Sequence, residues 1–230
     1  MIFFDIDGTL IDHASASAAA SLQLFDRFSS EIPFRGEDFP LIWETALIKH
    51  FNRLCRGEIS IFDQRRARIR DVFANSTLSE HDCDVRYRIF ISHYESLTQP
   101  FEDAAEYLAR LCGQRLGIIS NGAREQQIGK LQRAGLLRHF SVMVFSEDVG
   151  LGKPAPKIFL EACRQAGEEP SECIHIGDDL TADVHASHAV GMTPIWLDRT
   201  GEPDSPLQVP ARITSLNDLS AVLDGKLCCA

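Results

Sequence analysis

Short apolar runs alternate with amphipathic stretches along most of this chain. The first run, Ile2-Phe3-Phe4, is apolar on both faces, which is typical of a strand in a parallel sheet covered on both sides. Similar runs predict strands at 116–120, 142–145, 173–176 and 194–197, and helical spacing predicts helices at 102–111, 124–134, 156–165 and 181–190. This alternation predicts βαβ units and therefore an α/β fold: a three-layer core with a parallel, Rossmann-like sheet.

The stretch after the first strand has a different pattern. From about 13 to 94 the apolar residues recur at helical spacing, and Ser60 followed by Asp63 predicts a capping box at the start of one helix. We expect four or five helices and no strand here. The prediction is therefore an all-helical cap domain at 14–96, inserted into an α/β catalytic core formed by 1–13 and 97–230 and lying over its site. A Pro-rich loop at 201–210 then leads to a short strand at 211–213 and a final helix at 216–223.

Composition narrows the class of protein. The chain has 230 residues, 44% of them hydrophobic, and a formal net charge of −10, which is ordinary for a globular protein and argues against binding to a nucleic acid polymer. The seven cysteines form no C-x-x-C pair, so we expect neither a disulfide framework nor a zinc site, and most should be small buried groups. No apolar stretch reaches membrane-spanning length and the first strand is interrupted by acids, so we expect no signal peptide, no membrane association and a cytoplasmic location.

Polar side chains follow four of the predicted strands. The first strand ends at Asp5 and Asp7, the second at Ser120-Asn121-Gly122, and the fourth at Gly177-Asp178-Asp179 with Asp183 one helical turn later; Lys153 follows the third strand in a glycine-rich loop. Carboxyl ends of parallel strands converge at one edge of a sheet. Together these groups would offer carboxylates for Mg²⁺, a hydroxyl for phosphate oxygens and one lysine.

Each motif alone has a plainer interpretation. The two acids after the first strand are also compatible with a solvated strand end, and Ser120-Asn121-Gly122 and Gly177-Asp178-Asp179 with ordinary helix caps. Lys153 before Pro154 is compatible with a surface lysine. Their order after consecutive strands favours a shared site.

As a set, these motifs resemble the haloacid dehalogenase superfamily, in its branch of phosphatases with a helical cap. The matching segments are Asp5-Ile6-Asp7-Gly8-Thr9, Ser120-Asn121-Gly122, Lys153-Pro154, and Gly177-Asp178-Asp179 with Asp183, and the resemblance covers essentially the whole chain. The segments 57–60 and 146–154 are similar to nucleotidases and N-acylneuraminate-phosphate phosphatases.

The resemblance implies a role for each residue. Asp5 would be the nucleophile, Asp7 the general acid and base, and Ser120 and Asn121 the phosphate-binding residues. Lys153 would pair with both Asp5 and the phosphate. Mg²⁺ would be held by Asp5, Asp178 and the main-chain carbonyl of Asp7, supported by Asp183. Asp179 departs from the small residue common at its position, and we expect it to be an extra ligand or a support for the metal site.

The predicted function is Mg²⁺-dependent hydrolysis of a small phosphorylated metabolite, a nucleoside monophosphate or a sugar phosphate, through an aspartyl phosphate. A phosphomutase and a haloacid dehalogenase on the same core remain alternatives, although Asp7 disfavours dehalogenation because a halide needs no proton. A non-catalytic binding or regulatory protein is a further alternative. The pattern does not predict an oligomeric state.

Three further groups of residues receive an interpretation. His175 falls inside a strand and is predicted to be a core histidine, whereas His185 and His188 are expected on an exposed helix face. The tail Cys228-Cys229 is expected to be disordered. The basic run of the helical stretch is expected to be a solvated face, the alternative being that one arginine reaches an anionic part of the substrate; it comprises Lys49, Arg53, Arg56, Arg65, Arg66, Arg68 and Arg70.

Overall fold

The computed structural model describes residues 1–111, 113–201 and 211–227. The chain forms two compact units, one from Met1–Ile11 and Pro100–Ala230 and the other from Asp12–Gln99. The predicted loop beyond residue 201 and the Cys228-Cys229 tail lie outside the described residues. Within those residues, no helix is both long enough and apolar enough to cross a bilayer.

The first unit is built on a parallel sheet. Its strands, as far as the chain is described, are β1 (Ile2–Phe4), β2 (Leu116–Ser120), β3 (Phe140–Phe145), β4 (Ile174–Gly177), β5 (Thr193–Leu197) and β6 (Arg212–Ile213). They lie in the order β3-β2-β1-β4-β5-β6. The central strand is β1, in which Phe4 is aligned with Ile118 of β2 and with Ile176 of β4. The predicted α/β fold with a parallel sheet is therefore confirmed, and the carboxyl ends of β1, β2 and β4 are neighbours.

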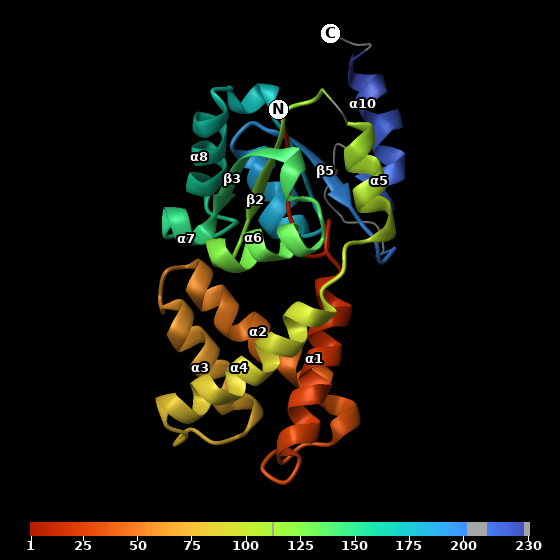
Figure 1. Ribbon diagram of the computed structural model, residues 1–230. Helices are drawn as coiled ribbons and strands as arrows, with labels where there is room; N and C mark the ends of the chain where they lie inside the picture. Colours follow the sequence, from red (N-terminus) through yellow and green to blue (C-terminus); the bar gives the residue numbers. More distant parts are fainter. Residues whose placement is uncertain (112, 202–210, 228–230) are drawn as a thin grey trace. The chain divides into compact units, whose positions relative to one another are not determined.

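Helices cover both faces of this sheet (Figure 1). They are α5 (Glu102–Arg110), α6 (Arg124–Arg133), α7 (Ser146–Val149), α8 (Pro156–Ala166), α9 (Ala186–Ala189) and α10 (Leu219–Leu227). Helices α5, α6 and α10 contribute to the apolar cluster around Phe4, and α8 and α9 contribute to the cluster around Phe3. Successive strand residues point to opposite faces, so these two neighbours each anchor one layer.

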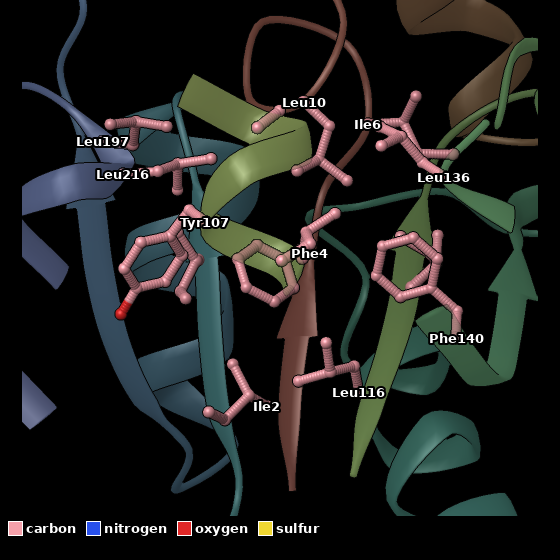
Figure 2. Packing of buried hydrophobic residues seen from close by; sticks show 14 of the residues in the cluster. Ile2, Phe4, Ile6, Leu10, Tyr107, Leu116, Leu136, Phe140, Leu197 and Leu216 are labelled. Carbon is pink, nitrogen blue, oxygen red and sulfur yellow. The ribbon is translucent and has the colours of Figure 1, made fainter. Parts of the chain in front are cut away.

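The packing around Phe4 is dense and aromatic. Figure 2 shows Phe4 between Tyr107 of α5 and Phe140 of β3, and its ring meets that of Phe140 edge-on with centroids 6.3 Å apart. Phe3 and Phe4 are both completely buried. Burial of one such side chain contributes about 1.5–3 kcal/mol, so the strand that carries the first two acids is firmly fixed in the core.

Three local predictions for this unit need correction. The stretch 181–190 is not one α-helix, because a π-helical segment over Leu180–His185 precedes the short α9. The segment 146–154, expected to be a loop, begins with the single helical turn α7, which Gly150 ends in a left-handed conformation at φ +77°. His188 is exposed as predicted, but His185 is half-buried.

The regular elements of the second unit are all helices, as predicted. Its α-helices are α1 (His13–Phe28), α2 (Phe39–Cys55), α3 (Ile61–Val72) and α4 (Glu80–Leu97), with a 3₁₀ turn at Gly36–Asp38. Trp43 of α2 and Phe90 of α4 pack with ring centroids 4.1 Å apart at its centre. The predicted capping box is present: the Ser60 hydroxyl accepts from the Asp63 amide at 3.1 Å, and the Asp63 carboxylate accepts from the Ser60 amide at 3.4 Å.

The basic run of this unit is not a uniform solvated face. Arg68 is only 4% exposed, and its guanidinium lies 4.5 Å from the centre of the Trp43 ring, with Tyr87 and Phe90 also within cation–π range. Two nitrogen atoms of the Arg66 guanidinium each donate to one oxygen of the Asp84 carboxylate. The prediction of solvated side chains fails for these two arginines, because α3 turns them toward α4 and the aromatic core.

Candidate active site

The first motif leaves the sheet at its centre. Asp5 directly follows β1 and is 6% exposed, and its amide donates to the carbonyl of Ile176 in β4 at 2.9 Å. Gly8 then adopts φ +82°, a conformation that favours glycine. A Cβ at this position would lie 2.1 Å from a carboxylate oxygen of Asp178. Glycine therefore permits both the turn and the close approach of the fourth motif to the first.

Lys153 connects the first and fourth motifs by charge. Its ammonium Nζ is buried 2.7 Å from Oδ1 of Asp5 and 2.5 Å from Oδ1 of Asp183. Burial opposes the charged form of Lys153, but the two carboxylates more than offset it and raise the pKa of the ammonium. Lys153 is therefore a fixed positive charge beside the predicted nucleophile, not a surface lysine.

Asn121 holds the main chain of Lys153. Its side-chain oxygen accepts from the Lys153 amide at 2.7 Å, and its side-chain nitrogen donates to the Lys153 carbonyl at 3.1 Å. Both ends of the amide are thus occupied by the backbone of the third motif. The structure gives Asn121 a positioning contact and leaves its predicted contact with phosphate without support. Ser120 is buried at the end of β2, as expected of a residue at the site.

Three carboxylates form a cluster beside Lys153. Oxygen atoms of Asp5, Asp178 and Asp183 lie within 4.8 Å of one another. Burial, followed by repulsion from Asp5 and Asp183, raises the pKa of Asp178 to about 8, and burial likewise raises the pKa of Asp5 to about 6. Asp183 differs because Lys153 and His175 outweigh its burial and lower its pKa to about 2.

The cluster fits a divalent cation. If all three carboxylates were ionised they would face a single ammonium, and the raised pKa values of Asp5 and Asp178 reflect burial and this repulsion; Mg²⁺ would balance the excess negative charge with the oxygen ligands it prefers. Asp183 is occupied by protein donors: Oδ1 by Lys153 and by Nε2 of His175 at 2.9 Å, and Oδ2 by the Asp179 amide at 3.2 Å. Asp5 and Asp178 are therefore the better candidates for direct metal ligands, and Asp183 supports the cluster.

Two neighbours position Asp178. The Thr9 hydroxyl donates to its Oδ1 at 3.1 Å, and the Trp196 indole donates to its main-chain carbonyl at 3.0 Å. The Asp179 carboxylate accepts from the amides of Thr181 and Ala182, each at 2.7 Å, and so caps the following helical turn. The main-chain amide of Asp179 donates to Oδ2 of Asp183, and a role of its carboxylate toward a metal stays a prediction.

The side chain of Asp7 is bound by residues other than those that form the carboxylate cluster. Nζ of Lys130 is 2.7 Å from both of its carboxylate oxygens, and Nε2 of Gln127 is 3.1 Å from Oδ2. Both partners come from α6, and sequence reasoning missed them. The signal in the sequence was the helical spacing of Gln127, Lys130 and Leu131, which places all three on one face of α6. In the structure this face is buried. His175 is the core histidine that was predicted, with the added contact to Asp183.

The family comparison agrees with the motifs. The family model described as haloacid dehalogenase-like hydrolase matches residues 1–191. Human N-acylneuraminate-9-phosphatase is 26% identical over 239 residues, covering 99% of this chain and 94% of its own. A phosphoserine phosphatase from Thermus thermophilus is 36% identical over 112 residues, which cover 48% of this chain and 45% of that relative. The chain thus spans about half the length of the first relatives it matches.

A solved structure has the same fold. The putative HAD-hydrolase YfnB from Bacillus subtilis, described as bound to magnesium, superposes with a TM-score of 0.80 at 23% identity, covering 97% of both chains. Together with the family match, this confirms the resemblance on which the roles of the four motifs were predicted.

Proposed function

Because the chain belongs to the haloacid dehalogenase-like hydrolase family, we propose that it is a Mg²⁺-dependent phosphomonoesterase that works through Asp5. One observation carries the proposal: Asp5 is buried between Lys153 and the carboxylate cluster, whereas Asp7, two residues later, is held separately by α6. Nucleophile and proton-transfer group are thus provided by two carboxylates in different surroundings, as acid–base division of labour requires.

The reaction has two displacements at phosphorus. A carboxylate oxygen of Asp5 attacks the phosphoryl group, the bond from phosphorus to the substrate oxygen breaks, and Asp7 gives that oxygen a proton. Asp7 then takes a proton from water, which attacks phosphorus and breaks its bond to Asp5. Lys153 stays within ion-pair distance of Asp5 throughout, stabilising the charge that moves between carboxylate and phosphoryl oxygens.

The residues proposed to hold Mg²⁺ are Asp5, Asp178 and the main-chain carbonyl of Asp7. The bound ion would supply charge neutralisation for the phosphoryl oxygens. Thr9 and Trp196 fix Asp178 for this purpose, and Asp183 keeps Lys153 in place.

The substrate is proposed to be a small phosphorylated metabolite, a sugar phosphate or a nucleoside monophosphate. Support comes from relatives that are matched over most of their own length, among them N-acylneuraminate-9-phosphatases and a glyceraldehyde 3-phosphate phosphatase. We assign substrate selection to the helical unit Asp12–Gln99, acting as a cap, since the core motifs are needed for any phosphomonoester.

Phosphate release from a panel of phosphomonoesters tests the proposal. The panel holds an aryl phosphate, sugar phosphates and nucleoside monophosphates, each with Mg²⁺ and with a chelator. We expect metal-dependent release that Asp5→Asn abolishes, while Asp26→Asn, an exposed acid of the helical unit, leaves it unchanged. Release that survives in Asp5→Asn refutes the covalent step. Isomerisation without release would indicate a phosphomutase, and halide release from a haloacid a dehalogenase.

A further inference from the structure

Helix α6 brings two polar side chains to Asp7. Gln127 and Lys130 are three residues apart and therefore share a helix face. Nζ of Lys130 lies 2.7 Å from each oxygen of the Asp7 carboxylate, which fixes both its position and its plane. Gln127 donates to the same carboxylate at 3.1 Å and also to the Ser120 hydroxyl at 3.1 Å and the Asn121 carbonyl at 2.7 Å.

Lys130 and Gln127 are both buried, which is unfavourable for a charged and a polar side chain unless each has a partner. The Lys130 side chain is 3% exposed and Gln127 is 2% exposed, while the Asp7 side chain remains 27% exposed. A buried ammonium is unfavourable without an opposite charge. Lys130 and Gln127 thus hold the partly exposed carboxylate of Asp7 from a buried position on α6. Gln127 also links this carboxylate to Ser120 and Asn121 of the second motif.

Each of the two acids of the first motif has its own lysine. Asp5 faces Lys153 and belongs to the carboxylate cluster, whereas Asp7 faces Lys130. Without Lys130, a second flexible carboxylate two residues from Asp5 would be free to turn toward a divalent cation. The two lysines keep the two carboxylates apart.

We propose that Lys130, assisted by Gln127, is a positioning residue for Asp7 that keeps its carboxylate out of the metal-binding cluster and in place for proton transfer to the leaving oxygen. This inference rests on the proposed phosphomonoesterase function. It deepens that function by making the importance of Lys130 depend on the leaving group. An alkoxide must receive a proton as its bond to phosphorus breaks, whereas a nitrophenolate leaves without one.

Kinetics with two substrates tests the inference. Wild type, Lys130→Met and Lys130→Arg are compared on 4-nitrophenyl phosphate and on the alkyl phosphate that the wild type turns over fastest. For Lys130→Met we expect kcat/KM, which reports only the steps up to departure of the leaving group, to fall about 10–100-fold on the alkyl phosphate and less than about threefold on the aryl phosphate, within the range of general acid catalysis. Lys130→Arg, which retains the charge, should recover most of the alkyl activity. Lys157→Met removes an exposed lysine of α8 and serves as the matched control.

A double-mutant cycle separates positioning from a general structural effect. In the Asp7→Asn background, Lys130→Met should lower alkyl phosphate turnover by less than about twofold, because residues that act as a unit are not additive. Equal losses of kcat/KM on both substrates, or full additivity with Asp7→Asn, would overturn the inference. A wild type inactive on every phosphomonoester removes the proposed function itself, and this inference with it. If Lys130→Met fails to fold by circular dichroism, Gln127→Leu is measured on the same two substrates with the same expected asymmetry.

Discussion

Replacing Gly8 by alanine should damage the active site far more than it damages the fold. The added Cβ would lie 2.1 Å from Oδ2 and 2.5 Å from the carboxyl carbon of Asp178, whereas ordinary contact begins near 3.4 Å. Asp178 or the first motif must therefore move by about 1 Å, a displacement that costs about 100-fold in turnover when it affects catalytic groups. We also expect the Mg²⁺ concentration needed for half-maximal activity to rise.

The cost to stability is smaller and can be worked out separately. Gly8 has φ +82°, and a left-handed conformation costs a non-glycine residue about 1–2 kcal/mol. The loss of chain entropy in the unfolded state returns about 0.4–1 kcal/mol of this. The resulting backbone cost of about 1 kcal/mol lowers Tm by about 2–4 °C for a chain of this size, and the displacement of Asp178 adds to it.

Gly167→Ala is the matched control. Gly167 ends α8 at φ +68°, and nothing lies within 4 Å of the position its Cβ would take. Both variants incur the backbone cost, but only Gly8→Ala displaces Asp178. Thermal unfolding, phosphate release and Mg²⁺ titration are measured on both. Turnover and Mg²⁺ requirement within about twofold of each other in the two variants would refute the assignment of Asp178 to the metal site.

Three further predictions concern single contacts. Arg199, Ser215 and the Leu216 amide outweigh burial and lower the pKa of Asp103; its contribution to stability is therefore complete above its usual pKa of 3.8 and is lost as the pH falls below that value. Asp103→Asn should flatten the acid limb of a plot of Tm against pH, and an unchanged limb contradicts this. Arg68→Met should keep or raise Tm because an apolar side chain of similar volume avoids the cost of a buried charge, while Arg68→Ala should lose about 2–3 kcal/mol of unfolding free energy in denaturant titrations. Asn121→Ala should lower kcat about tenfold with little change in KM because it leaves the Lys153 main chain unpaired; a raised KM with unchanged kcat would instead support direct phosphate binding.

The sequence was most informative where a residue's chemistry and its place along a strand coincide. Asp5, Lys153 and Asp178 each follow a strand of a parallel sheet, and the topology brings such positions to one edge whatever the intervening chain does. The apolar run of β1 predicted both the strand and its central burial. These are consequences of periodicity and strand order, which a sequence displays directly.

Partners supplied by helices were harder to predict. The helical spacing of Gln127, Lys130 and Leu131 places them on one face of α6, but the sequence does not show whether that face is buried until the helix is packed against the sheet. Arg68 was misjudged for the same reason, since its surroundings are aromatic residues distant in sequence. The capping role of Asp179 was not predicted, because a carboxylate beside a proposed metal ligand and a helix cap look alike in sequence, and only the amides of the following turn reveal the cap.

The central place of β1 also bears on how the protein is made. This strand is synthesised before its neighbours on the two sides, which begin only at Leu116 and Ile174. While the chain grows from its amino end, the helical unit Asp12–Gln99 is complete long before the sheet has its middle strands paired. Long-range pairing of this kind is slow and exposes apolar strands in the meantime. The residue proposed as nucleophile is thus translated long before the strands that complete its working environment, so ribosome-bound intermediates would carry Asp5 without its catalytic partners.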